Sequence, residues 1–321
     1  MTLHEVSPAY IAPLLWQTAK ELGQAADEKV DSIVEELIVL GAISELSAKI
    51  KAGKTTFVGQ LLRCMFAGED FLGLRTQPVV VLYLTEEGPN TFRSMLVRAG
   101  LMEEERLHVL RRGIVPKTLT WPEVVATLVI PKAQEVGAKL VIVDTLSRWA
   151  GIKADEENQA GAAAMAMQPL EDLRDLNIAV LTVHHDRKSG GEVGDSSRGS
   201  SAWGGAGDVL LGLVNSNVTG HPNRRKLTSI GRFSDPGIWV IDYEQHRYNL
   251  ISTSTGNVER ERVKNQLLGL QSSIAMTYQQ MEILTGSNRS TLERALEELQ
   301  QEGLAIKSGS GVRGDPFLFS L

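Results

Sequence analysis

The sequence contains a single cysteine and no long apolar stretch. An internal disulfide is impossible because Cys64 has no second cysteine to pair with, and this fits a reducing compartment. No apolar run reaches the roughly 20 residues needed to cross a bilayer. The first ten residues lack the basic and apolar regions of a secretory signal. We therefore expect a cytoplasmic protein with no membrane partner.

The chain also has fewer basic than acidic residues. The formal net charge is −6, which argues against a surface that is basic throughout, as static duplex binding needs, but leaves room for a local basic channel. Hydrophobic residues make up 42% of the chain and charged residues 22%, as in ordinary soluble globular proteins. At 321 residues the chain is long enough for one full-size domain and a smaller one.

Hydrophobic patterning divides the chain into three parts. Residues 1–32 carry apolar residues near helical spacing and predict a helical lead-in. Residues 33–250 alternate helix-like patterns with short apolar runs, typical of strands buried in a parallel sheet, and predict an α/β domain. Residues 251–257 have the composition of a linker, and residues 258–321 predict a separate small domain. The strands expected in the large domain are 42–47, 79–84, 140–144, 179–184, 209–214, 226–230 and 239–243.

The most specific local pattern is AKIKAGKTT at residues 48–56, which lies between an expected strand and an expected helix. In that context the pattern predicts a P-loop. Its backbone N–H groups and the N-terminus of the following helix create a positive field for phosphate oxygens. We expect Lys54 to contact the β- and γ-phosphates of ATP and the Thr55 hydroxyl to bind Mg²⁺. The residues expected to form the nucleotide-binding loop are Ala48, Lys51, Ala52, Gly53, Lys54, Thr55 and Thr56.

Ala48 departs from the usual pattern, which has glycine at this first position of the loop. Alanine is tolerated there if its φ is negative. The competing interpretation is a chance Gly-Lys-Thr at a helix start, and the flanking strand and helix patterns argue against it.

Two further expected strands end in carboxylates. An apolar run ends in Asp144, the pattern in which the aspartate holds a water of the Mg²⁺ shell. Between this motif and the P-loop, another strand ends in Glu86 and Glu87, and a carboxylate there can polarise the attacking water. The alternative for these two glutamates is a pair of solvated acids at a helix N-terminus, where acids are favoured anyway.

The strand expected after Asp144 ends in two histidines, His184 and His185. A histidine at that place can sense the γ-phosphate and report to the following loop, although a lone strand-end histidine is more often structural. Metal binding is the weaker alternative, because no third ligand at useful spacing is evident.

The following segment, residues 189–207, is rich in glycine and serine, a composition typical of a loop that a ligand orders. Between residues 186 and 232 basic residues outnumber acidic ones, although the whole chain is acidic. This favours contact with a nucleic-acid backbone, and a solvated surface loop is the other interpretation. Arg232, just past an expected strand, is either an ordinary surface residue or an arginine finger that reaches the γ-phosphate in a neighbouring subunit.

The small C-terminal domain has the pattern of a winged helix. Many such modules place the third helix in the DNA major groove, but here that helix is rich in glutamate. Arg289 near its start and Arg313 on the wing are the residues best suited to DNA, and a protein-docking or structural module is an equal alternative. The expected elements are helices at 259–268, 277–284 (with Thr277 as N-cap) and 287–302, then strands at 304–307 and 317–321.

The order of these motifs resembles the RepA-like ATPases. These belong with the RecA-type hexameric replicative helicases, AAA ATPases found on plasmids, phages and related mobile elements. The resemblance covers about residues 30–250 and implies a RecA-like core, assembly into a ring of identical subunits, and ATP hydrolysis coupled to single-stranded DNA. It rests on AKIKAGKTT, YLTEE, VIVDTLSRWAG, DEEN, TVHHDRKSGG, RGSSAWGGAGD and IGRFSDP, in this order.

The resemblance also implies roles for single residues. Residues 53–55 match the P-loop and Asp144 the Walker B acid, while Glu86 falls on the catalytic glutamate. His185 falls on the sensor position, and Arg232 falls near the arginine finger that acts on the adjacent subunit. The glycine-rich segment corresponds to the part that lines the central channel of the ring. Its candidate DNA contacts are Arg187, Lys188 and Arg198.

Together these features favour an ATP-hydrolysing DNA motor, a ring-forming replicative helicase of the RepA-like type. The runner-up is an ATP-switched initiator or regulatory protein that binds a duplex site through the winged helix and does not unwind DNA. A third interpretation, a regulatory ATPase without a nucleic-acid partner, is opposed by the locally basic loop.

Overall fold

The chain divides into two units, residues 1–31 and residues 32–321. Most of the predicted helical lead-in at residues 1–32 lies outside the residues that the structure describes. Among the described residues, no helix is both long and apolar enough to cross a membrane. The computed structural model describes residues 18–21, 31–153, 160–185, 207–216, 222–254, 256–269, 275–287, 289–312 and 315–320.

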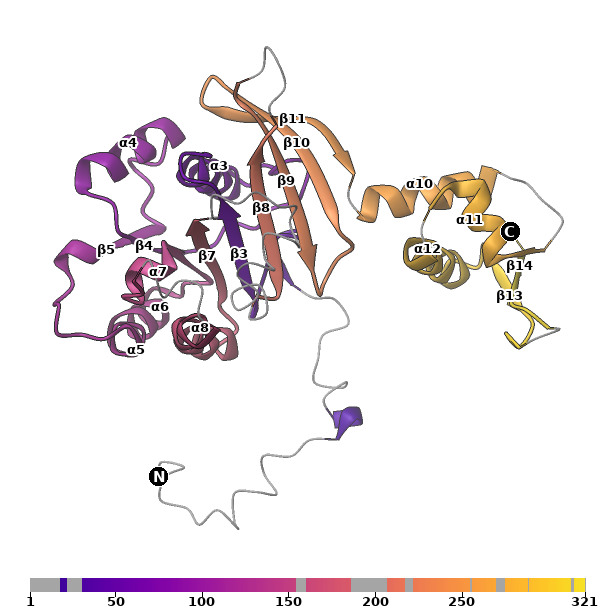
Figure 1. The fold of residues 1–321 in the computed structure, drawn as a ribbon, viewed down its shortest axis with the longest axis horizontal. Helices are drawn as coiled ribbons and strands as arrows, with labels where there is room; N and C mark the ends of the chain where they lie inside the picture. The colour runs from indigo at the N-terminus through magenta and orange to yellow at the C-terminus, as the bar shows by residue number, and fades with distance from the viewer. Residues whose placement is uncertain are drawn as a thin grey trace, which may run out of the picture. The chain divides into compact units, whose positions relative to one another are not determined.

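A nine-stranded sheet, counted over the described residues, forms the centre of the second unit (Figure 1). Its order is β11-β10-β9-β8-β3-β7-β6-β4-β5. The six strands from β8 to β5 run parallel, and β9, β10 and β11 extend the sheet in antiparallel pairs. The bounds are β3 (Ile43–Ala48), β4 (Val81–Thr85), β5 (Leu107–Arg111), β6 (Leu140–Asp144), β7 (Ala179–His185), β8 (Val209–Asn215), β9 (Arg224–Gly231), β10 (Gly237–Glu244) and β11 (Arg247–Ser254). All seven predicted strands are confirmed.

Each face of the sheet has its own hydrophobic core, because alternate residues of a strand point to opposite faces. In β6, Leu140 and Ile142 pack in the core under α3 and α4, whereas Val141 and Val143 pack in the core under α5 to α8. Figure 1 shows the two helix groups on opposite sides of the sheet. The bounds are α3 (Lys54–Ala67), α4 (Pro89–Ala99), α5 (Trp121–Val124), α6 (Ile130–Val136), α7 (Leu146–Trp149) and α8 (Ala160–Asp175), with short turns of helix η2 (Arg112–Ile114) and η3 (Val125–Val129).

The C-terminal helices and the last two strands also lie at their predicted positions, and a short strand at Met276–Thr277 had not been predicted. Three helices and a small sheet of order β12-β14-β13 surround a separate core that includes Leu292, Leu296 and Phe319. Thr277 caps its helix as predicted, since its hydroxyl accepts a hydrogen bond from the Gln280 backbone N–H. Their bounds are α10 (Gly256–Gly269), β12 (Met276–Thr277), α11 (Tyr278–Thr285), α12 (Arg289–Gln301), β13 (Ile306–Ser308) and β14 (Leu318–Ser320).

The linker predicted at residues 251–257 is wrong in position. Strand β11 runs to Ser254 and α10 begins at Gly256, so the sheet passes almost directly into the C-terminal module. The polar residues of β11 are compatible with a strand because its ladder with β10 is made by backbone groups. The turn before β11 places Gln245 and His246 at positive φ, as a two-residue hairpin requires. It lacks the glycine by which such a turn is usually predicted from sequence.

Two further parts of the sheet region had not been expected from the sequence. Strand β5 lies at the edge of the sheet and its residues are largely half-exposed, so it lacks the continuous apolar run of the central strands. Strands β1 (Ser32–Val34) and β2 (Ile38–Val39) form a short antiparallel pair before the P-loop strand.

Candidate functional site

The loop between β3 and α3 has the backbone geometry of a tight turn. Ala48 is the last residue of β3 and keeps a strand conformation, so the condition for replacing glycine there is met. Lys51 and Gly53 have φ values of 64° and 100°, in the left-handed region that non-glycine residues rarely adopt. Gly53 caps the N-terminus of α3, which places Lys54 and Thr55 in the first turn of a 14-residue helix. Free backbone N–H groups at such a terminus favour an anion.

The Lys54 side chain is buried, and its ammonium group is held inside the loop. Nζ donates hydrogen bonds to the backbone oxygens of Ala48 at 2.9 Å and Lys49 at 3.4 Å. It also lies 2.8 Å from Nδ1 of His185, at the end of β7. Burial lowers the pKa of His185, and the charges of Lys54 and then Arg148 lower it further. A neutral imidazole that accepts from Lys54 fits these surroundings.

Asp144, at the end of β6, is a buried carboxylate beside the P-loop. The Tyr83 hydroxyl donates to its Oδ2 at 2.8 Å. Burial raises the pKa of Asp144 to about 6, while the hydrogen bond from Tyr83 and the charge of Lys54 lower it. A buried carboxylate is stabilised by a cation, and Mg²⁺ prefers carboxylate, hydroxyl and water oxygens. Asp144 and Thr55 therefore offer donors of the right chemistry for this ion.

Glu86 and Glu87 both reach this region, with different partners. Glu86 accepts a hydrogen bond from the Thr145 hydroxyl at 3.1 Å and forms an ion pair with Arg148 at 3.4 Å. Burial and the charge of Glu86 raise the pKa of Glu87, while the nearby Thr55 side chain lowers it. Glu87 thus faces the predicted Mg²⁺ ligand, a placement that its position at the end of β4 could have indicated.

Residues of the P-loop and the strand-end residues Glu86, Glu87, Asp144 and His185 line one cavity of about 320 Å³. Three of the lining residues, Thr91, Arg98 and Thr145, were not anticipated from the sequence. Thr91 and Arg98 come from α4, which packs against α3 through Gly59 and Met95, so only the tertiary fold brings them to the loop. The cavity is lined by Lys51, Gly53, Lys54, Thr55, Thr56, Glu86, Glu87, Thr91, Arg98, Asp144, Thr145 and His185.

Arg232 follows β9 and does not belong to the described lining of this cavity. Its guanidinium group pairs with Asp208 Oδ1 at 3.1 Å, and the arginine side chain is 70% exposed. The guanidinium group is therefore exposed to solvent while it pairs with Asp208, and the two interpretations of Arg232 both stay open.

The predicted DNA contacts are only partly described. Arg187, Lys188, Arg198 and Arg313 lie outside the described residues. Arg289 stacks on the ring of Tyr278, with 3.4 Å between the guanidinium carbon and the ring centre, and pairs with Glu293 at 2.7 Å. In this conformation the charge of Arg289 is used within the C-terminal module. Among the described residues, no group of three histidine, cysteine or acidic side chains could hold a metal ion by itself.

Comparison with known proteins agrees with this fold. A family model described as an AAA domain matches residues 10–191, more than half of the chain. Among solved structures, a KaiC-like protein from the hyperthermophilic archaeon Pyrococcus horikoshii OT3 superposes with a TM-score of 0.51 at 12% sequence identity, covering 70% of this chain and all of that one. No curated protein matches the chain. The chain therefore belongs to the AAA domain family, and its central domain has a RecA-like P-loop ATPase fold.

Proposed function

We propose that this protein is an ATP-driven DNA motor that assembles as a ring and unwinds DNA, as the RepA-like helicases do. The observation that carries the proposal is the contact between Lys54 and His185. It joins the lysine of the P-loop to the strand that leads directly into the glycine-rich segment with the candidate DNA contacts Arg187, Lys188 and Arg198. A change at the γ-phosphate can thereby reach the part of the chain best suited to grip a phosphodiester backbone.

In this proposal the chain holds Mg-ATP through its own loop. Backbone N–H groups of Lys51 and of residues 53–56, together with the Lys54 ammonium, bind the phosphates, while Thr55 and Asp144 hold Mg²⁺. The ion, when bound, neutralises charge on the β- and γ-phosphate oxygens. Ala48 and Ala52 shape the turn without lining the cavity, and the Ala52 carbonyl accepts a hydrogen bond from Arg225 at 3.0 Å.

Hydrolysis requires a carboxylate that orients the attacking water and a positive charge that stabilises the transition state. Glu86 is the proposed water-orienting residue, and Thr145 and Arg148 hold its side chain in place. Glu87 is the second candidate, because it lines the same cavity as Thr55 and Glu86. Arg232 is proposed to act in the cavity of the adjacent subunit, and its exposure allows this.

The test is the ATPase rate with and without single-stranded DNA, together with strand displacement on a forked duplex. The proposal predicts stimulation by single-stranded DNA and ATP-dependent displacement, both lost in Lys54→Ala. An ATPase that neither responds to DNA nor separates strands would exclude the motor.

The second candidate function is an ATP-switched initiator or regulator that binds one duplex site. The observation that favours it is the C-terminal module, which has its own hydrophobic core, three helices and a small sheet. A footprint at a single sequence that survives Glu86→Gln, but is lost when residues 256–321 are removed, would support this function over the motor.

A further inference from the structure

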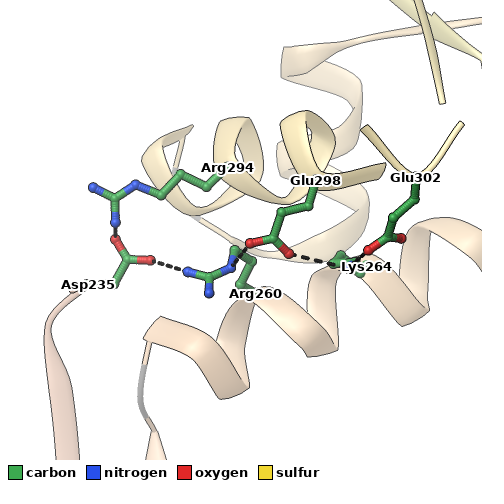
Figure 2. Close-up of polar contacts among 6 residues, drawn as sticks. All are labelled: Asp235, Arg260, Lys264, Arg294, Glu298 and Glu302. Carbon is green, nitrogen blue, oxygen red and sulfur yellow. Dashed lines mark hydrogen bonds and ion pairs between the residues drawn. The ribbon is translucent and has the colours of Figure 1, made fainter. Parts of the chain in front are cut away.

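A buried carboxylate joins the ATPase domain to the C-terminal module. Asp235 lies in the loop between β9 and β10, and its side chain is only 7% exposed. It accepts hydrogen bonds from two arginines on two different helices, Arg260 of α10 at 3.4 Å and Arg294 of α12 (Figure 2). A single loop residue is thus held by both helices that face it.

The two arginines belong to a larger network of alternating charges. Arg260 also pairs with Glu298 at 2.7 Å, and Lys264 pairs with Glu298 at 3.2 Å and with Glu302 at 2.7 Å. Figure 2 shows these side chains in a row between α10 and α12, with Asp235 at one end. The module alone contributes three positive and two negative groups to this row. Asp235, from the ATPase domain, supplies the third negative charge.

A second acid of the ATPase domain supports the same arrangement. Glu36, in the turn between β1 and β2, is buried; burial and the charge of Glu35 raise its pKa, and the charge of Arg260 lowers it. The ion pairs that join the ATPase domain to the module are those of Asp235. Opposite charges that lose water on contact fix a register more firmly than exposed pairs do.

The loop that Asp235 anchors is the loop that carries Arg232. At its other end, the Arg232 backbone N–H donates to the Asp208 carbonyl at 3.0 Å, and the Arg232 side chain pairs with the same residue. The short segment between them contains Phe233, whose ring is 42% exposed. The loop is therefore fastened to the sheet at Asp208 and to the C-terminal module at Asp235.

We infer that Asp235 is a positioning residue through which Arg260 and Arg294 of the C-terminal module set the conformation of the Arg232 loop. The inference rests on the proposed function, in which Arg232 acts on the nucleotide of the adjacent subunit. Under this arrangement the state of the module and the rate of hydrolysis are coupled. A ligand that draws the module away from Asp235 loosens the loop and slows hydrolysis in the neighbouring cavity.

The experiment compares full-length Asp235→Asn and Arg294→Ala with the wild type in steady-state ATP hydrolysis. Each variant is expected to lower kcat by about fivefold or more with the KM for ATP within about twofold, because each subunit binds ATP with its own P-loop. Arg294→Lys should recover most of the rate, since an ammonium can still reach Asp235. Arg174→Ala removes an arginine that pairs with Asp175 on α8, away from the network, and is the matched control that should behave as wild type.

Arg232→Ala separates failure of the inference from failure of the proposed function. If Arg232→Ala lowers kcat but Asp235→Asn and Arg294→Ala hydrolyse ATP at the wild-type rate, the inference is wrong and the proposed role of Arg232 stands. A wild-type kcat for Arg232→Ala removes the role of Arg232, and with it the inference. A rise in KM that accompanies the fall in kcat of Arg294→Ala, without recovery in Arg294→Lys, also overturns it, because the effect is then general damage to the domain.

Discussion

Lys54 illustrates how a single side chain is prepared for a ligand. Its ammonium group is buried, and two backbone carbonyls and one imidazole surround it at hydrogen-bond distance. Such a group loses little additional hydration when it transfers part of this contact to a phosphate oxygen. The same contact explains why His185 is a better candidate sensor than His184, which is buried in the sheet and whose pKa burial lowers to about 3.

The two glutamates after β4 make the first prediction. Glu86→Gln should lower kcat by about 10²-fold or more while Mg-ATP still binds, because an amide cannot accept the proton of the attacking water. Single-turnover hydrolysis and nucleotide titration measure the two effects separately. Glu87→Gln is the matched control, and a larger loss of kcat in Glu87→Gln than in Glu86→Gln would transfer the role to Glu87.

Glu36 gives a prediction on pH and stability. Burial, followed by the charge of Glu35, raises the pKa of Glu36 to about 7, from an ordinary value of 4.5. Between these pH values the folded protein holds a proton that the unfolded chain has released, so the free energy of unfolding falls as pH rises through this window. Glu36→Gln should therefore stabilise the protein more at pH 8 than at pH 5, as measured by urea unfolding.

The control for this variant is Glu103→Gln, at an exposed position, which should change stability little at either pH. An equal effect of Glu36→Gln at pH 5 and pH 8 would show that the Glu36 carboxyl does not titrate in the predicted window.

At the scale of elements, the P-loop depends on one turn between a strand and a helix. Gly53 has φ of 100°, and a side chain there is strained whatever the space around it. In Gly53→Ala the loop can relieve this strain by leaving the conformation that binds the phosphates. Strain of only 1.4 kcal/mol corresponds to a factor of ten in affinity, so Mg-ATP binding should weaken by about tenfold or more. Isothermal titration measures the affinity.

Gly68→Ala is the matched control for Gly53→Ala, because Gly68 also has positive φ but ends α3 with open space around it. It should lower stability and leave nucleotide affinity unchanged. Equal affinity in wild type and Gly53→Ala would mean that the turn geometry is not what binds the phosphates.

The strands that position the site were predictable because they are buried on both faces of the sheet. Strands β3, β6 and β7 are covered on both faces, so their apolar runs and their terminal Ala48, Asp144 and His185 stand out in the sequence. Strand β11 was not predictable in the same way. It lies at the sheet edge, carries polar residues and follows a turn without glycine, so no hydrophobic pattern marks it.

The cavity wall on α4 was also beyond prediction from local patterns. Arg98 lies on an exposed helix surface, and its place beside the P-loop depends on how α4 packs on α3, where Gly59 allows the approach of Met95. The same holds for Asp235, whose partners are contributed by helices that follow it in sequence and return to it in space. Contacts between distant segments of this kind are set by tertiary packing and leave no periodic signal.

At the scale of the whole molecule, a continuous series of contacts connects the candidate nucleotide cavity, the sheet and the C-terminal module. Lys54 and His185 join the cavity to β7, and β7 pairs with β3 in the middle of the sheet. At the antiparallel end of the sheet, the β9–β10 loop meets the module through Asp235. The proposed motor uses both ends of this arrangement, the glycine-rich segment after β7 for DNA and the Arg232 loop for the neighbouring subunit.

The central claim is that the β3–α3 loop binds the phosphates of ATP, and Lys54→Ala tests it most directly. Binding of Mg-ATP and its turnover should be measured on the wild type and on this variant, with circular dichroism to confirm equal folding. The account predicts that the variant loses at least about tenfold in affinity and nearly all hydrolysis, since Lys54 supplies the positive charge that faces the phosphates. Wild-type affinity and turnover in a folded Lys54→Ala protein would contradict it.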